Sequence, residues 1–262
     1  MDSNPSKIRT WSFDAFLCVV ADMSKNALIS GANKGIGLET ARQLGQLGYK
    51  VYIGARDIVK GEAAEAELKS QGIDAEFVLL DMSAPSTFRT VYNHIESVDG
   101  HLDALINNAG IILDFGVAPS EVGIGALKET FDVNFFAQIE LTQLLLPLLK
   151  KSEAGRVVNV SSILGSLTLN SDPESSLGDW RSLGYNSSKT ALNAFTTLLA
   201  FDLKDTKIKV NSAHPGWVKT DLGGPNALLG IEDGAKTSVW LATLPQDGPT
   251  GGYYHLQAKL PW

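Results

Sequence analysis

The sequence predicts an α/β fold: one doubly wound parallel sheet of about seven strands with helices on both faces. Three observations predict it. Short apolar runs alternate with segments of helical length, a glycine-rich turn follows the first run, and polar residues follow several later runs. The chain has 262 residues, of which 44% are hydrophobic and 19% charged, and this suits one large globular domain.

Residues 1–25 precede the first predicted strand, and we expect them to form a loosely ordered N-terminal extension. Its apolar run, 15–21, lies between Asp14 and Asp22 and is far too short to span a bilayer. We therefore expect neither a cleaved signal nor a membrane anchor. The single cysteine, Cys18, suits a reducing compartment, so we expect a cytoplasmic protein.

Six short apolar runs, each followed by turn residues, have the pattern of buried strands. Strands that alternate with helices in this way form a parallel sheet through right-handed crossovers. We expect them to build one domain over residues 26–262. The runs are 27–30, 51–54, 76–80, 104–107, 156–161 and 208–213.

Helical segments separate these runs, for example 39–48 and 61–72, the second of which ends in a glycine that can cap it. Two later helices carry apolar stripes, which core packing explains but which subunit interfaces also use. A homodimer, a homotetramer and a monomer therefore all stay open. The stripes contain Phe131, Phe135, Leu141, Leu144, Leu145 and Leu148 in one helix, and Leu192, Phe195, Leu198 and Leu199 in the other.

The charge pattern argues against two kinds of partner. The formal net charge is −7 and no run is rich in lysine or arginine, so we expect no nucleic acid partner. The four histidines do not have the spacing of metal ligands, so we expect no metal site.

A glycine-rich segment, SGANKGIG at 30–37, joins the first predicted strand to the first helix. Its glycines are Gly31, Gly35 and Gly37, in the spacing G-x-x-x-G-x-G. Glycine lets the backbone turn sharply and lets a pyrophosphate approach the helix N-terminus, where free N–H groups favour an anion. The segment predicts a dinucleotide-binding, Rossmann-like domain.

The residues after the second strand indicate which dinucleotide binds. An acidic side chain there would bind the ribose hydroxyl of NAD, whereas a cation would bind the 2′-phosphate of NADP. Arg56 follows the strand, and Lys34 in the glycine loop is a second candidate cation. They favour NADPH/NADP+. Asp57 keeps NAD open if the strand runs one or two residues longer.

Polar residues at later strand ends lie where a doubly wound fold binds its ligands. They include Asp81 and Met82 after the third strand, Asn108 after the fourth and Ser162 after the fifth. Asn134 lies inside the long striped helix. Each residue alone has a structural explanation as a cap or a turn, but their joint order is specific.

In this order the pieces SGANKGIG, NNAG, VN at 133–134, VNVSS, YNSSK and HPGWVKT resemble the short-chain dehydrogenases/reductases over nearly the whole chain from residue 26. NKGIG, GARD and PGWVKTDL resemble the NADPH-dependent carbonyl reductases most. The resemblance implies a catalytic tetrad of Asn134, Ser162, Tyr185 and Lys189, with Ser162 preferred over Ser161. It also implies cofactor contacts at Gly31, Lys34, Gly35, Ile36, Gly37, Arg56, Asp81, Met82, Asn108, Tyr185, Lys189, Val218 and Thr220.

Tyr185 and Lys189 are four residues apart, which places them on one face of a helix. A lysine ammonium near a tyrosine favours the phenolate, so we expect it to lower the pKa of Tyr185 toward neutral pH. Ser162 would bond the substrate oxygen as charge develops there. Asn134 would position a water that links Lys189 to solvent.

The segment between Ser162 and Tyr185 is longer than in typical members of the family. It forms either a wall of the substrate pocket, with Trp180 and Leu183 as lining, or a solvated loop that can cover a subunit interface. We expect residues 221–234 to form a mobile lid. Apolar substrate contacts are expected from Leu222, Leu228, Leu229 and, unless it packs in the core, Trp217.

The resemblance implies an NADPH-dependent carbonyl reductase that transfers hydride to a ketone or aldehyde, with Tyr185 as general acid. The main alternative is an NAD-dependent dehydrogenase of the same fold that acts on an alcohol, steroid or polyol, which Arg56 disfavours. A non-catalytic NADP(H) sensor is the third possibility, although such proteins usually lack the tyrosine or the lysine.

Overall fold

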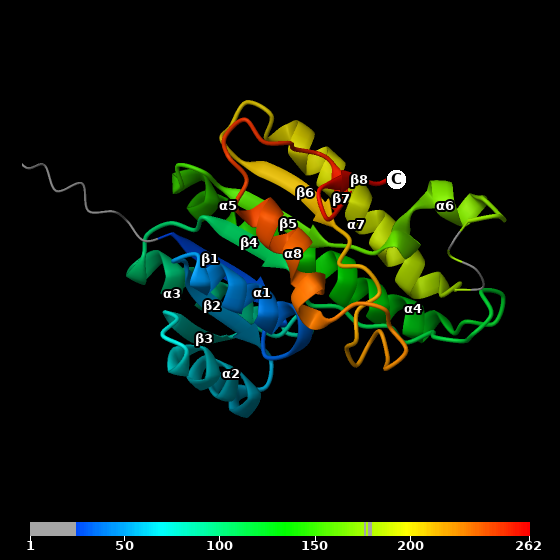
Figure 1. Ribbon diagram of the computed structural model, residues 1–262, viewed down its shortest axis with the longest axis horizontal. Coiled ribbons are helices and arrows are strands. Elements are labelled where there is room, and N and C mark those ends of the chain that lie inside the picture. The colour runs from blue at the N-terminus through cyan, green and yellow to red at the C-terminus, as the bar shows by residue number, and fades with distance from the viewer. Residues whose placement is uncertain (1–24, 176, 178–179) are drawn as a thin grey trace, which may run out of the picture.

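The computed structural model describes residues 25–175, 177 and 180–262, which form one sheet with helices on both faces (Figure 1). The sheet order is β3-β2-β1-β4-β5-β6-β7-β8, and every neighbouring pair is parallel except β7 and β8. This confirms the predicted fold class. The strands are β1 Asn26–Ser30, β2 Lys50–Ala55, β3 Ala75–Leu79, β4 Ala104–Asn107, β5 Arg156–Val160, β6 Lys209–Ala213, β7 Tyr253–His255 and β8 Ala258–Lys259.

The helices cover the sheet in two layers because their apolar faces pack on opposite sides of it. Residues of α1, α2 and α8 belong to one core cluster, and residues of α3, α5 and α7 belong to the other. The helices are α1 Gly35–Gln46, α2 Ile58–Ser70, α3 Ser86–Val98, α4 Ile124–Phe131, α5 Ala137–Lys151, α6 Leu167–Ser171, α7 Leu183–Asp202 and α8 Ile231–Ala242, with a π-helical stretch Asp132–Phe136 and a 3-10 turn Ile163–Gly165.

The eighth strand, β8, goes beyond the predicted number of about seven. Leu256 and Gln257 have φ angles of 44° and 70°, the left-handed backbone of a tight two-residue hairpin. This turn reverses the chain and pairs β8 antiparallel to β7 at the edge of the sheet.

The two predicted apolar stripes divide between core and surface. Leu141, Leu145 and Leu148 of α5 and Leu192 of α7 are fully or almost fully buried. Leu198 of α7 is 69% exposed, so this position contributes an apolar surface and not core packing. Which oligomer the protein forms stays a prediction.

The predicted N-terminal extension lies almost entirely outside the described residues, which begin at Lys25. Across the described part of the chain, no helix combines the length and apolar character that a membrane crossing requires. Within those same residues, the side chains of His, Cys, Asp and Glu form no group of three that could hold a metal ion.

Candidate functional site

The candidate site lies at the carboxyl ends of the strands, where the sheet order reverses between β1 and β4. The glycine loop leaves β1 here with Gly31 at φ 66° and Gly35 at φ 58°, both in the left-handed region. Asn108, which follows β4, donates from Nδ2 to the carbonyl of Ser30 at 2.8 Å and to that of Gly31 at 3.2 Å. The loop is therefore tied to the neighbouring strand at the reversal point.

The start of α1 has the features of a pyrophosphate site. Lys34 is the N-cap, and its side chain makes no capping bond, so the first helical N–H groups are available to an anion. Gly37 has no room for a side chain, because a Cβ would lie 2.5 Å from the Gly31 carbonyl oxygen and 2.6 Å from Nδ2 of Asn108. The backbones of the glycine loop and of α1 are therefore in close contact, and such close packing is typical of a dinucleotide-binding turn.

The cations predicted to select NADP are at the surface. Arg56 directly follows β2 and is exposed, while Lys34 forms an ion pair with Asp221. Asp57 is the N-cap of α2, where its carboxylate accepts from the Lys60 amide at 3.1 Å. Because β2 ends at Ala55, Asp57 begins a helix, and the longer strand on which the NAD alternative depended does not form.

The other predicted cofactor contacts surround this loop. Thr220 lies against it, since a Cβ on Gly35 would come within 3.6 Å of the Thr220 methyl group. Val218 is buried and packs, together with Ile36, around Gly234 at the start of α8. Beyond β3, Met82 is buried, while the Asp81 carboxylate accepts from the Ser83 amide at 2.9 Å and closes a turn.

The four predicted catalytic residues lie close to one another. Asn134 lies in the π-helical stretch between α4 and α5, a helix irregularity that is frequent at functional sites. A Cβ on Gly110 would lie 3.4 Å from Oδ1 of Asn134 and 3.5 Å from Nζ of Lys189. Asn134 also donates to Ser188 Oγ at 3.1 Å, so its side chain is held against α7.

Tyr185 and Lys189 are one turn apart near the start of α7, and both are buried. The Lys189 ammonium lies 5.7 Å from the centre of the Tyr185 ring and donates to the Val160 carbonyl at 2.8 Å. Burial lowers the pKa of Lys189 to about 8. At neutral pH the lysine is therefore mostly charged, although its desolvation opposes the charge.

The pKa of Tyr185 differs from the sequence-based expectation. Burial raises it to about 12, and the hydrogen bond with Ser162 only partly opposes this rise. The expected lowering by Lys189 is therefore wrong, because desolvation of the phenolate by burial is the largest influence on this pKa and the hydrogen bond with Ser162 is the only one that lowers it. Tyr185 is protonated at neutral pH, as any tyrosine is, and the raised pKa makes its hydroxyl a weaker acid than the sequence predicted.

Ser162 is placed to contact the tyrosine, whereas Ser161 is not. The Ser161 hydroxyl donates to the backbone carbonyl of Lys189 at 3.4 Å, on the inner side of the loop. Ser162 Oγ accepts from the Leu164 amide at 3.2 Å and bonds Tyr185. The two hydroxyls therefore bond in different directions, and the preference for Ser162 as the catalytic serine stays a prediction.

The sequence did not reveal two groups that support the tetrad. Asp114, which is buried, accepts from the Gly184 amide at 2.6 Å and so holds the first turn of α7 next to Tyr185. Asn107 of β4 donates to Asn159 of β5 at 2.8 Å, and Asn159 donates to Thr196 of α7 at the same distance. Asn107 and Asn159 lie within the NNAG and VNVSS pieces, but their spacing does not reveal the bond between them, and no motif marks Asp114 or Thr196, because these groups act through contacts between distant segments.

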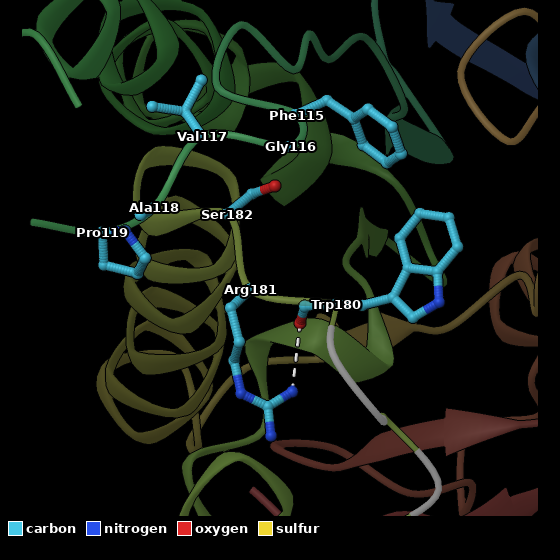
Figure 2. Close-up of a pocket in the computed structure, with 8 residues that line it drawn as sticks. All are labelled: Phe115, Gly116, Val117, Ala118, Pro119, Trp180, Arg181 and Ser182. Atoms are coloured by element: carbon cyan, nitrogen blue, oxygen red, sulfur yellow. Dashed lines mark hydrogen bonds between the residues drawn. The ribbon is translucent and has the colours of Figure 1, made fainter. Parts of the chain in front are cut away.

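An aromatic cluster of Phe115, Trp180 and Trp217 lies at the outer side of the site. The Trp180 ring centre is 5.2 Å from that of Phe115 and 5.6 Å from that of Trp217. Figure 2 shows Phe115 and Trp180 with both rings on one side of a hollow of about 450 Å³, while the Arg181 side chain points away from them. The hollow is lined by Phe115, Gly116, Val117, Ala118, Pro119, Trp180, Arg181 and Ser182.

A second hollow, of about 470 Å³, shares Phe115 and Trp180 with the first and extends beneath the 221–226 segment. Of the predicted substrate contacts, Trp180, Trp217 and Leu222 line it, whereas Leu228 is 80% exposed. Leu229 pairs with Val218 in a short β-bridge, and Leu183 begins α7 and lines neither hollow. An apolar wall thus stands next to the loop that carries Asp221, the partner of Lys34.

Comparison with known proteins places the chain in a family. The family model described as short chain dehydrogenase matches residues 25–227. Carbonyl reductase (NADPH) 1 of Homo sapiens is 35% identical over 275 aligned residues, which cover 90% of this chain and 98% of the human protein. Short-chain dehydrogenase/reductase 1 of Saponaria officinalis is 32% identical and matches 90% of this chain and 95% of its own length.

Solved structures show the same relationship. The NADPH-bound carbonyl reductase from chicken fatty liver superposes with a TM-score of 0.80 at 26% identity, covering 91% of this chain and 99% of that chain. Salutaridine reductase from Papaver somniferum superposes with a TM-score of 0.76 at 29% identity, covering 88% and 99% of the two chains.

Proposed function

Because the chain belongs to the short-chain dehydrogenase family, we propose that it is an NADPH-dependent carbonyl reductase that converts a ketone or aldehyde to an alcohol. The observation that carries the proposal is the arrangement of three buried side chains, in which Tyr185 bonds Ser162 and has the Lys189 ammonium 5.7 Å from its ring centre. The glycine loop at the same strand ends supplies a place for the dinucleotide.

Carbonyl reduction adds a hydride to carbon and a proton to oxygen. A bound reduced nicotinamide supplies the hydride. Tyr185 donates its hydroxyl proton to the carbonyl oxygen as negative charge develops there. Ser162 donates a hydrogen bond to the same oxygen. The Lys189 ammonium then stabilises the phenolate that forms on Tyr185, 5.7 Å away when measured to the ring centre.

The choice of NADPH rests on positive charge around the 2′-phosphate. Arg56 directly follows β2 and is exposed, which leaves its guanidinium accessible for bidentate bonding to a phosphate. Lys34 lies in the glycine loop and forms an ion pair with Asp221. The pKa of Asp221 is lowered, mainly by Lys34 and also by Lys60. Lys34 and Lys60 therefore both act on Asp221, which agrees with positive charge at the glycine loop and at the start of α2.

An Arg56→Ala variant tests both the cofactor and the reaction. We expect kcat/KM for NADPH to fall about 10- to 100-fold, the value of one charge-assisted contact, with little change for NADH. Steady-state rates with each cofactor and one aryl ketone measure this. Arg89→Ala, which removes an exposed arginine of α3, is the matched control. Equal losses with both cofactors in Arg56→Ala would contradict a phosphate contact.

The aromatic cluster supports a substrate with an apolar, planar group next to its carbonyl. Phe115, Trp180 and Trp217 present partly exposed ring surfaces to the two hollows, and aromatic faces stack favourably on planar rings. Trp180 belongs to the long segment between Ser162 and Tyr185, so we propose that this segment walls the pocket.

The cell compartment and the assembly state are also proposals. The single cysteine of the chain favours a reducing compartment, and on that ground we place the enzyme in the cytoplasm. The exposed Leu198 and Phe201 of α7 and Phe136 of the π-helical stretch offer an apolar surface that a second copy can cover.

A further inference from the structure

His214 lies where the pairing of β5 and β6 ends, next to the loop that carries Ser162. The two strands pair in parallel up to Val160 and Ala213, and the Ser161 amide donates to the Ala213 carbonyl at 2.8 Å. In a parallel ladder the next donor, the Ile163 amide, would bond the carbonyl two residues further along β6. That residue is Pro215, after which the chain turns away through Gly216 at φ 88°.

The imidazole of His214 replaces the missing ladder acceptor. The Ile163 amide donates to Nδ1 of His214 at 3.2 Å, and the Gly216 amide approaches the same nitrogen at 3.4 Å. Both partners are backbone donors, so Nδ1 carries no proton and the neutral ring is protonated at Nε2. Burial and the neighbouring His255 lower the pKa of His214 to about 3, which keeps the acceptor available.

Strand β7 holds the His214 residue in place. The His214 amide donates to the Tyr254 carbonyl at 2.8 Å, and Nδ1–H of His255 donates to the His214 carbonyl at 2.9 Å. The two imidazole rings lie 5.0 Å apart between their centres. With its backbone bonded on both sides and its ring packed, His214 has little freedom to turn Nδ1 away.

This contact bears directly on Ser162. The peptide on its N-terminal side is anchored through Ser161 to Ala213, and the peptide on its C-terminal side is anchored through Ile163 to His214. Ser162 itself is extended, with φ −150° and ψ 147°, and its hydroxyl bonds the Leu164 amide. The Ser162 carbonyl also accepts from the Gly165 amide at 2.8 Å, but this bond stays within the loop. Without the second anchor, the loop loses its bond to the residue that follows β6 and can shift, which carries the hydroxyl away from Tyr185.

We infer that His214 is a positioning residue for carbonyl reduction: its Nδ1 fixes the Ser162–Ile163 peptide and so holds the Ser162 hydroxyl at Tyr185. The rate consequences rest on the proposed function, whereas the anchoring contact does not. A misplacement of about 1 Å in a reacting group costs about 10²-fold in rate, so the expected effect is large.

Two variants separate the acceptor from the volume of the side chain. His214→Leu fills similar space without an acceptor, and His214→Asn places an amide oxygen near the position of Nδ1. We expect kcat to fall about 30- to 100-fold in His214→Leu with KM for NADPH unchanged, and to return to within about threefold of wild type in His214→Asn. Equal melting temperatures of the two variants would show that the difference is not one of folding.

Amide hydrogen exchange of Ile163, measured by NMR on the same proteins, tests the contact without turnover. We expect at least about tenfold faster exchange in His214→Leu and near wild-type exchange in His214→Asn. Wild-type protein without turnover would refute the proposed function, and the exchange data would still decide the anchoring. The inference is overturned if Ile163 exchanges equally in all three proteins, or if His214→Asn is as impaired as His214→Leu.

Discussion

Replacing Tyr185 by Phe is expected to abolish most carbonyl reduction while leaving NADPH binding intact. The variant removes only the hydroxyl, which is buried and hydrogen-bonded to Ser162. General acid catalysis contributes about 10²–10⁴-fold in rate, so kcat should fall by that factor. Steady-state kinetics measure the loss, and fluorescence titration measures the dissociation constant of NADPH, which should change by less than about twofold.

Tyr253→Phe is the matched control for this experiment. Tyr253 is also fully buried, and its hydroxyl has no hydrogen-bond partner among the described residues. Its ring stacks on Trp262 with centres 5.6 Å apart, a contact that phenylalanine keeps. Loss of this hydroxyl should leave kcat within about twofold of wild type. Comparable rates for Tyr185→Phe and wild type would contradict the assigned role of Tyr185.

Replacing Lys189 by Met is expected to lower kcat about 100-fold or more. An ammonium about 6 Å from a forming phenolate stabilises it by about 3 kcal/mol at an effective dielectric constant of about 20, which corresponds to about 10²-fold in rate. The distance to the Tyr185 ring centre is 5.7 Å. Lys150→Met, which removes an exposed lysine of α5, should keep the wild-type rate. A Lys189→Met enzyme with more than about a third of wild-type kcat would contradict this role.

Lys189→Met is also expected to change how the folding stability depends on pH. Burial lowers the pKa of Lys189 from its ordinary value of 10.5 to about 8, so between these values the unfolded chain binds more protons than the folded one. The stability of the wild type therefore gains from rising pH in this window, and the full cost of the buried charge is present below pH 8. Methionine removes that cost.

The melting temperature of Lys189→Met relative to wild type should accordingly be most favourable near neutral pH and decline toward alkaline pH. The lost hydrogen bond to the Val160 carbonyl, present in the wild type at 2.8 Å, offsets part of the gain but carries no pH dependence. Calorimetry without cofactor at about pH 7 and about pH 9.5 measures the trend. A difference that does not change with pH would contradict a depressed lysine pKa.

Much of the fold could be predicted because the central strands carry their own signal. The strands around Leu28, Ile53 and Val158 are mostly apolar and are buried over nearly their whole length, since a parallel sheet buries both faces, and each is followed by turn residues. β8 could not be predicted in this way. Its turn uses Leu256 and Gln257 with positive φ, where a sequence would normally signal the hairpin with asparagine or glycine.

Within the site, the spacing of residues along one helix predicted which of them share a face. Contacts between distant segments could not be predicted from the sequence. The separation of four positions between Tyr185 and Lys189 places them on one helix face wherever that helix packs. The pKa of Tyr185 depends on how deeply the packed chain buries it, which no local pattern encodes. The same reason hides the bonds from Gly184 to Asp114 and from Ile163 to His214, which join residues 70 and 51 positions apart.

Transfer of deuterium from NADPH labelled at both C4 positions to an aryl ketone tests the central claim most directly. We expect an alcohol with one deuterium on its carbinol carbon, formed at least about tenfold faster with labelled NADPH than with labelled NADH. Mass spectrometry of the product measures the label across a panel of aryl ketones, aldehydes and ketosteroids, whose alcohols keep it. Tight NADPH binding with no deuterium in any product would contradict the account and favour a cofactor sensor.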